Sequence, residues 1–216
     1  MPMDRSLRRG ISLGGTLDGG GLELDDDWFD AIRDAGLDLV RLPVCWDFVA
    51  ADRVDRAVEA GSARSLAVVL DVHHFEGTDA AFLAALPTLR LPDDPHLIAT
   101  VHHHLPFRFT HQGAPWIAGA DAWLGTPWGT AADRARIRAD LATAAAWARG
   151  RRLFLGEFGT RDAAPMAARA AWTALVRAEE ERLGMDWAYW DFATEFGAFD
   201  VASGSWRAPL LAALRG

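Results

Sequence analysis

Short apolar runs alternate along this chain with longer segments of helical periodicity, and this alternation most constrains the fold. Strands are expected at 10–13, 37–42, 66–72, 97–102, 153–156 and 185–190. Helices are expected between and after them, at 25–35, 52–63, 79–86, 131–149, 165–183 and 209–215. Strands that alternate with helices form βαβ units, so the pattern predicts a parallel sheet covered by helices.

The number of strands limits which parallel architecture is expected. Six strands are recognisable, and the chain has 216 residues, whereas a complete (β/α)₈ barrel typically needs about 250. No linker, repeat or low-complexity tract interrupts the alternation. We therefore expect an α/β fold, a reduced TIM-type (β/α) barrel with about six strands instead of eight, in which residues 1–216 form one compact domain.

Polar side chains collect directly after the expected strands. Because the carboxyl ends of parallel strands meet at one edge, where ligands bind in α/β proteins, these side chains are expected to lie together. They are Arg41, His73, His74, Glu76, His102, His103, His104, Glu157, Trp190 and Asp191.

Glu157 is the carboxyl group that stands out. It ends the apolar run Leu153-Phe-Leu-Gly-Glu-Phe-Gly159, and a carboxylate in such surroundings stays ionised only beside a partner. Arg41, at another strand end, is the natural counter-charge.

Histidine and tryptophan leave two readings open. A metal site would need three or four ligands to converge from His73, His74, His102, His103, His104 and His111, and the alternative is that these histidines line a subsite without metal. The ten Trp residues suit either core packing or the stacking of sugar rings; Trp190 could do either.

The net charge, the single cysteine and the N-terminal residues limit which partners and sites are expected. A net charge of −8 argues against nucleic acid and against an anionic membrane surface. The single cysteine, Cys45, excludes an intramolecular disulfide and a cysteine-ligated metal. The polar residues 1–9 contain neither a signal peptide nor a membrane span; they leave localisation undecided.

Six motifs follow one another along the chain. They are Arg41-Leu-Pro-Val-Cys-Trp46, Leu70-Asp-Val-His-His74, Val101-His102, Phe107-Arg-Phe-Thr-His-Gln-Gly-Ala-Pro-Trp116, Gly156-Glu-Phe-Gly159 and Trp187-Ala-Tyr-Trp190. In this order they resemble the strand-end motifs of family 5 glycoside hydrolases, in particular its endoglucanases. The resemblance runs from about residue 9 to residue 214, and its most specific parts are Phe-Thr-His-Gln-Gly-Ala and Gly-Glu-Phe-Gly.

The resemblance implies a retaining β-glycanase that acts on β-glucan or mannan without a cofactor or a metal. Glu157 would be its nucleophile, steadied by Arg41, and His102 would bond near the catalytic pair. His73, His74, His104, Trp116 and Trp190 would contact the substrate, with His104 at a position where the family often has Tyr.

The chain departs from the family at the acid/base. The family's Asn-Glu-Pro motif is absent, and residues 75–96 are too few for the two strand-helix units that usually stand there. Glu76 is the nearest replacement acid/base, ahead of Asp191 and Glu195. A carbohydrate-binding barrel without catalysis is the competing interpretation.

The missing units also leave two sheet edges. We expect either that strand 66–72 pairs with strand 97–102 to close a six-stranded barrel, or that the chain forms a homodimer through the exposed edges.

Overall fold

The computed structural model describes residues 8–19, 21–45, 49–72, 98–148 and 150–216. Within these ranges the six expected strands are confirmed, with ends that differ by at most two residues. They are β1 (Arg9–Ser12), β2 (Leu39–Val44), β3 (Ala67–Val72), β4 (Ala99–His102), β5 (Leu153–Glu157) and β6 (Asp186–Tyr189).

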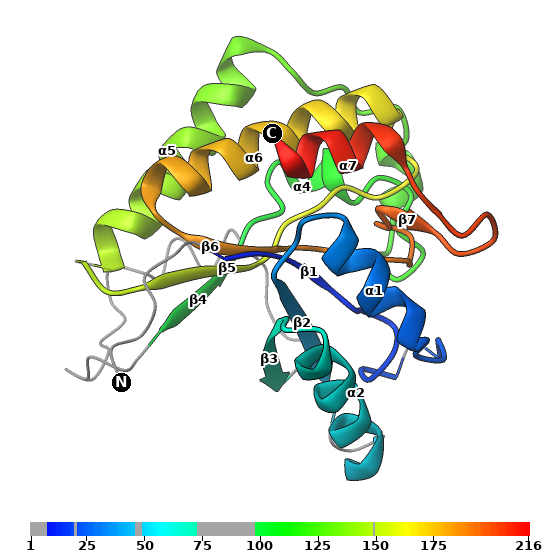
Figure 1. Cartoon of the computed structure of the whole chain (residues 1–216). Helices are drawn as coiled ribbons and strands as arrows, with labels where there is room; N and C mark the ends of the chain where they lie inside the picture. The colour runs from blue at the N-terminus through cyan, green and yellow to red at the C-terminus, as the bar shows by residue number, and fades with distance from the viewer. Residues whose placement is uncertain (1–7, 20, 46–48, 73–97, 149) are drawn as a thin grey trace.

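The six strands form one parallel sheet in the order β3-β2-β1-β6-β5-β4. The sheet curls into a half-barrel with helices outside it (Figure 1), which confirms the reduced TIM-type (β/α) barrel. Closure through pairing of the third and fourth strands was a wrong expectation for the described residues, because β3 and β4 stand at opposite ends of the sheet and are not paired with each other.

Five expected helices are also confirmed, and the expected helix 79–86 lies outside the described residues. The five are α1 (Asp26–Asp34), α2 (Ala51–Ala63), α5 (Ala131–Ala148), α6 (Met166–Leu183) and α7 (Ala208–Arg215). In Figure 1, α5, α6 and α7 lie together above the strands, while α1 and α2 lie beside β1, β2 and β3. Asp25 begins α1 as an N-cap whose side chain accepts a hydrogen bond from the Asp27 N–H.

Four short elements were not expected, because two to four residues are too few to show a periodicity. They are α4 (Phe107–Thr110), the 3₁₀ turn η2 (Ala120–Trp123), and the antiparallel strands β7 (Phe199–Asp200) and β8 (Ser205–Trp206). All of them lie in the segments that follow β4 and β6, where they shape the carboxyl edge of the sheet.

Aromatic side chains fill the space between β6 and α6. The Phe158 ring meets the Trp187 and Tyr189 rings edge to face, at centroid distances of 5.7 and 5.5 Å. Trp172 from α6 is fully buried at 6.3 Å from the same ring. For Trp172 and Trp187 the core interpretation is therefore correct.

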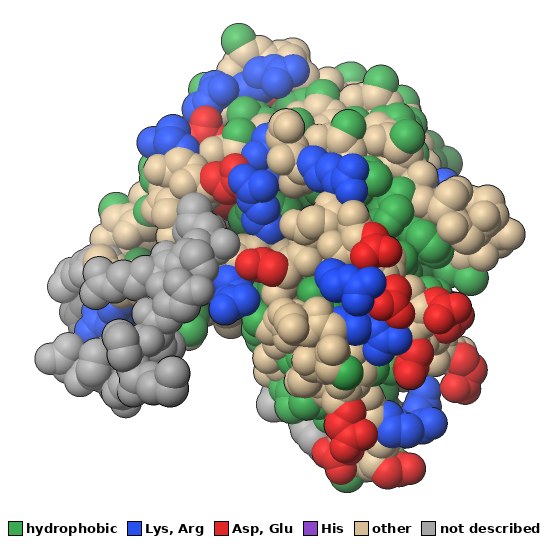
Figure 2. Space-filling view, viewed as in Figure 1, with side chains coloured by type: hydrophobic (Ala, Val, Ile, Leu, Met, Phe, Trp, Pro, Cys, Tyr) green, Lys and Arg blue, Asp and Glu red, His purple; other side chains and the backbone are tan. Residues whose placement is uncertain are grey.

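Surface side chains differ between the two sides of the half-barrel. Acidic side chains gather over α1 and α2 (Figure 2). At the sheet edges, Leu70 of β3 is 47% exposed and Ile98, next to β4, is 44% exposed. Among the described residues, no helix combines the length and the apolar character needed to cross a bilayer.

Candidate functional site

Glu157 lies at the carboxyl end of β5 and is 8% exposed. Glycines on either side let the strand approach its neighbours closely. A Cβ at Gly156 would stand 2.8 Å from Thr100 Oγ1, and one at Gly159 would overlap the Trp190 carbonyl oxygen. The Gly-Glu-Phe-Gly motif therefore packs this carboxyl group tightly between β4 and the segment after β6.

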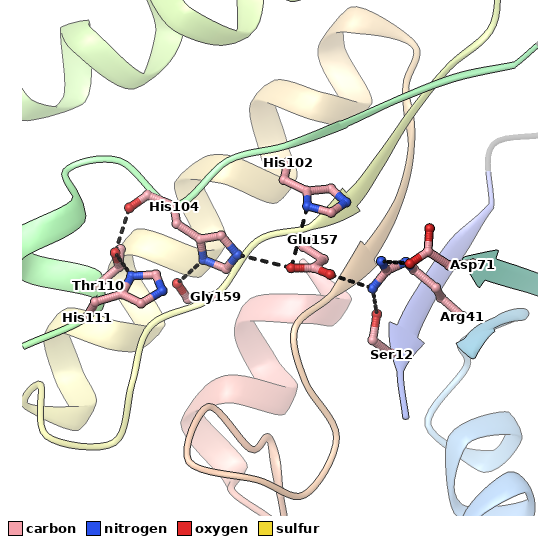
Figure 3. Close-up of polar contacts among 9 residues, drawn as sticks. All are labelled: Ser12, Arg41, Asp71, His102, His104, Thr110, His111, Glu157 and Gly159. Carbon is pink, nitrogen blue, oxygen red and sulfur yellow. Dashed lines mark hydrogen bonds and ion pairs between the residues drawn. The ribbon is translucent and has the colours of Figure 1, made fainter. Parts of the chain in front are cut away.

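Arg41 extends from β2 toward Glu157, and the two side chains meet (Figure 3). Its Nη1 lies 2.7 Å from Glu157 Oε1, and its Nη2 donates to Asp71 Oδ2 at 2.6 Å. Nη1 also donates to Ser12 Oγ at 3.4 Å. The guanidinium is 1% exposed, so one buried cation holds two carboxylates, and the ion pair expected between Arg41 and Glu157 is confirmed.

Two histidines face the other carboxylate oxygen. His102 Nδ1, at the end of β4, and His104 Nε2 each lie 3.6 Å from Glu157 Oε2. The His102 side chain is 33% exposed and that of His104 only 7%. The structure thus brings Glu157, Arg41, His102 and His104 together, as the sequence predicted.

These neighbours determine the charge of Glu157. Burial is the largest influence on its pKa and acts to raise it, but His102, His104 and Arg41 together outweigh burial and hold the pKa of Glu157 below its usual range. Glu157 is therefore an anion at neutral pH, which is the state a nucleophilic carboxylate needs.

Trp190 and Trp116 occupy different places. Trp190 is half-buried after β6, with the Arg41 guanidinium 5.7 Å from its ring centroid. Trp116 is 55% exposed and lies 6.4 Å from the Phe196 ring, which in turn lies 5.9 Å from His104. Trp116 is thus connected to the histidine side of the site through an intervening ring.

His111 continues this side of the site. Its Nδ1 lies 2.9 Å from Thr110 Oγ1, and its ring stacks on Phe107 at 4.1 Å. Burial, helped by the neighbouring His104, lowers the pKa of His111 to about 2. His111 is therefore neutral wherever the protein is folded at ordinary pH.

His73, His74 and Glu76 lie outside the described residues. His103 is buried and stacks on Trp172 at 6.2 Å. In the part of the chain that the structure describes, no three His, Cys, Asp or Glu side chains meet as metal ligands. Of the described histidines, His102 and His104 are the ones that face Glu157.

Asp191 follows Trp190 through a cis peptide bond and is fully buried. Its two carboxylate oxygens accept from the Thr194 N–H at 3.2 and 3.3 Å. Burial, which outweighs these bonds, raises the pKa of Asp191 to about 7. A proton sits on this group near neutral pH, but a side chain with no exposed surface cannot pass it to a substrate.

Two members of the site were not singled out from the sequence, Asp71 and Ser12. The signal for Asp71 was a charged residue inside the apolar strand Ala67–Val72, directly before two histidines. Ser12 carries no comparable signal. A groove between α1 and the β7–β8 segment, lined by Trp28, Phe199 and Trp206 among others, includes none of the residues around Glu157.

Fold and site together define a class of protein: a TIM-type half-barrel with an ionised carboxylate at the carboxyl edge of its sheet, paired with arginine and flanked by histidines and tryptophan. The sequence model of the cellulase family, glycosyl hydrolase family 5, matches residues 79–195, which is more than half of the chain. The chain belongs to glycoside hydrolase family 5.

A curated relative is Endoglucanase H of Acetivibrio thermocellus, 28% identical over 117 residues. The match covers 53% of this chain and 12% of that protein, so the chain spans a small part of its relative's length.

Solved structures are similar over almost the whole chain. Thermotoga maritima Cel5A in complex with cellobiose is 26% identical, with a TM-score of 0.88 over 96% of this chain and 97% of the other. The same enzyme in complex with mannotriose is also 26% identical, with a TM-score of 0.88 over 97% of this chain and 98% of the other. Subunit Z of the clostridial cellulose synthase from Clostridioides difficile, 24% identical with a TM-score of 0.85 over 98% and 100% of the two chains, shares the fold.

Proposed function

We propose that this protein is an endo-β-1,4-glycanase of the cellulase type that hydrolyses β-glucan or mannan with retention of configuration. The observation that carries the proposal is the buried Glu157 carboxylate, paired with Arg41 and faced by His102 and His104. The solved relatives in complex with cellobiose and with mannotriose support this substrate class.

In the first step Glu157 attacks the anomeric carbon, the bond to the leaving oxygen breaks, and that oxygen takes a proton from an acid. Water then attacks the anomeric carbon and gives a proton to the conjugate base of that acid, while the bond to Glu157 breaks and its carboxylate is regenerated. Arg41 keeps Glu157 ionised and oriented, His102 bonds near the reacting atoms, and Trp190 stacks against the sugar. Retention requires a second carboxyl group roughly 5–5.5 Å from the nucleophile.

Glu76 is the proposed second carboxyl. Among the described carboxyl groups, Asp71 is bound to Arg41 and Asp191 is fully buried, so neither is placed to protonate a leaving group. His73, His74, His104 and Trp116 are proposed to contact the substrate. A positioned acid or base accelerates such a reaction by about 10²–10⁴-fold. The rate of turnover should therefore depend strongly on Glu76 acting as the acid/base.

The test is the release of reducing ends from carboxymethyl cellulose and from glucomannan. Glu157→Gln should abolish release, Glu76→Gln should reduce it by about 10²-fold or more, and Asp200→Asn, a change in the β7–β8 segment, should leave it unchanged. Full activity in Glu157→Gln would remove that residue from its proposed role.

A second candidate function is carbohydrate binding without catalysis, which the missing Asn-Glu-Pro motif favours. Calorimetric titration with cellotetraose would then show binding by a protein that releases no reducing ends. Absence of both binding and turnover would contradict both candidates.

We also propose that residues 1–216 fold as one domain and that two copies pair through the edges of the sheet. Leu70 and Ile98, which are exposed at β3 and beside β4, would be covered in such a dimer. Sedimentation analysis should show a dimer that Leu70→Asp weakens; a monomer at high concentration would contradict the pairing.

A further inference from the structure

The two ring nitrogens of His104 have different partners. Nδ1 lies 3.2 Å from the Gly159 carbonyl oxygen. A carbonyl oxygen only accepts hydrogen bonds, so Nδ1 is the donor and carries a hydrogen. This contact joins the His104 ring to the strand end that carries Glu157.

The other nitrogen, Nε2, lies 3.6 Å from Glu157 Oε2. If the ring were neutral, its single hydrogen would already be on Nδ1, and Nε2 would direct a lone pair at the carboxylate. If both nitrogens carry hydrogen, the ring is a cation that faces an anion. Only the second arrangement is attractive with Glu157 ionised by Arg41 at 2.7 Å.

The charges around the ring are consistent with a cation. Arg41 carries one positive charge but faces two carboxylates, Asp71 at 2.6 Å and Glu157 at 2.7 Å, so a second cation beside Glu157 would balance the charges. On the far side of His104, the His111 ring, at 5.1 Å, is held neutral, and the segment after β6 presents the uncharged Phe196 ring. The positive charge of Arg161 helps to lower the pKa of His111. The His102 side chain is 33% exposed.

The same anchoring fixes the ring in place. Thr110 Oγ1 donates to the His104 carbonyl oxygen at 2.6 Å, and the side chain is only 7% exposed. A neutral ring cannot turn its single hydrogen toward Glu157 without giving up the bond to Gly159. The protonation state of His104 is therefore tied to the charge of Glu157.

We propose that His104 is an imidazolium that donates from Nδ1 to Gly159 and faces Glu157 with a protonated Nε2, and that this cation positions the nucleophile. Because the family often has an uncharged Tyr at this position, the chain would have gained a pH-dependent support for Glu157. The kinetic consequence rests on the proposed glycanase function, whereas the protonation state does not.

The direct test is imidazole ¹⁵N NMR on the full chain, with the His104 signals assigned by their loss in His104→Tyr. In the wild type both ring nitrogens should be protonated at pH 7. In Glu157→Gln the pH at which His104 loses its proton should fall by about 1–3 units, because an opposite charge within 4–6 Å has been removed. A singly protonated ring in the wild type, or an unchanged midpoint in Glu157→Gln, would overturn the proposal.

The kinetic test compares pH profiles. The kcat/KM of the wild type should decline at high pH as His104 deprotonates, and His104→Tyr, whose hydroxyl does not titrate near neutrality, should lack that decline. His102→Gln is the matched control, since His102 faces the same oxygen at the same distance but its side chain is 33% exposed, against 7% for His104; this variant should keep the decline. Retention of the decline in His104→Tyr would refute the positioning role, while absence of turnover in the wild type would refute the glycanase proposal and leave the NMR result to decide the protonation state.

Discussion

Asp191→Asn should make the protein more resistant to unfolding, by an amount that grows with pH. Asp191 is fully buried, and burial, with added negative charge from Glu195 and Asp18, raises its pKa from 3.8 to about 7. The folded-state pKa lies above the unfolded one, so the folded protein binds a proton that the unfolded chain lacks between about pH 4 and pH 7. Stability is therefore lost as the pH rises through this window. The rise of the pKa from 3.8 to about 7 corresponds to a loss of about 4 kcal/mol in the free energy of unfolding at and above pH 7.

Asparagine keeps the shape of the protonated acid and a carbonyl oxygen for the Thr194 N–H, but it does not ionise. Urea unfolding at half-unit steps from pH 4 to pH 8.5 should show the variant gaining on the wild type up to pH 7 and then running parallel to it. Asp200→Asn is the control: hydrogen bonds from Ser203 lower the pKa of the half-buried Asp200, so removing its charge should not give a gain in stability that rises with pH. A constant difference between Asp191→Asn and wild type at all pH values would refute this reasoning.

Three further predictions concern other buried or exposed groups. Arg41→Met should lower the free energy of unfolding by about 3–5 kcal/mol, because two carboxylates lose their buried counter-charge, and it should stop the release of reducing ends. Urea unfolding measures the first effect and a reducing-sugar assay the second. A variant with the stability and activity of the wild type would contradict both expectations. Glu180→Leu should stabilise the protein by about 1–3 kcal/mol, because this fully buried carboxyl has no hydrogen-bond partner in the described part of the chain and its pKa is raised by burial; a lower melting temperature would contradict this. Trp116→Ala should weaken cellotetraose binding in calorimetry while leaving the melting temperature unchanged, since the ring is 55% exposed; unchanged affinity would show that it does not contact the sugar.

The sheet was predictable from the sequence because each strand is a short apolar run that ends in a polar or glycine-rich segment. Leu153–Glu157 and Leu39–Val44 are buried along their whole length, as strands of a parallel sheet with covered faces are. Elements such as Phe199–Asp200 escaped prediction because they are held by one neighbouring strand and by ring packing against Trp206, which local periodicity does not encode.

The site was predictable where residue type and strand end coincide, as for Glu157, Arg41 and His102. The position of Asp71 was less accessible, because its role depends on register: β3 pairs with β2 so that Asp71 stands opposite Pro43, two residues beyond Arg41. The hydrogen on His104 Nδ1 was not accessible at all, since the partner that fixes it is a backbone carbonyl 55 residues away.

The order of the strands explains how the Arg41–Glu157 pair can persist in a chain without the Asn-Glu-Pro motif. Ser12, Arg41, Glu157 and Trp190 come from β1, β2, β5 and the end of β6, which are contiguous in the middle of the sheet. The two strand-helix units that the sequence lacks would stand between β3 and β4 along the chain. β3 and β4 are the two end strands of the sheet. Their loss therefore removes no strand that holds the Arg41–Glu157 pair. On the proposed function, nucleophilic attack by Glu157 would depend on the central strands, whereas leaving-group protonation would depend on Glu76, so the two properties would be separable by substitution.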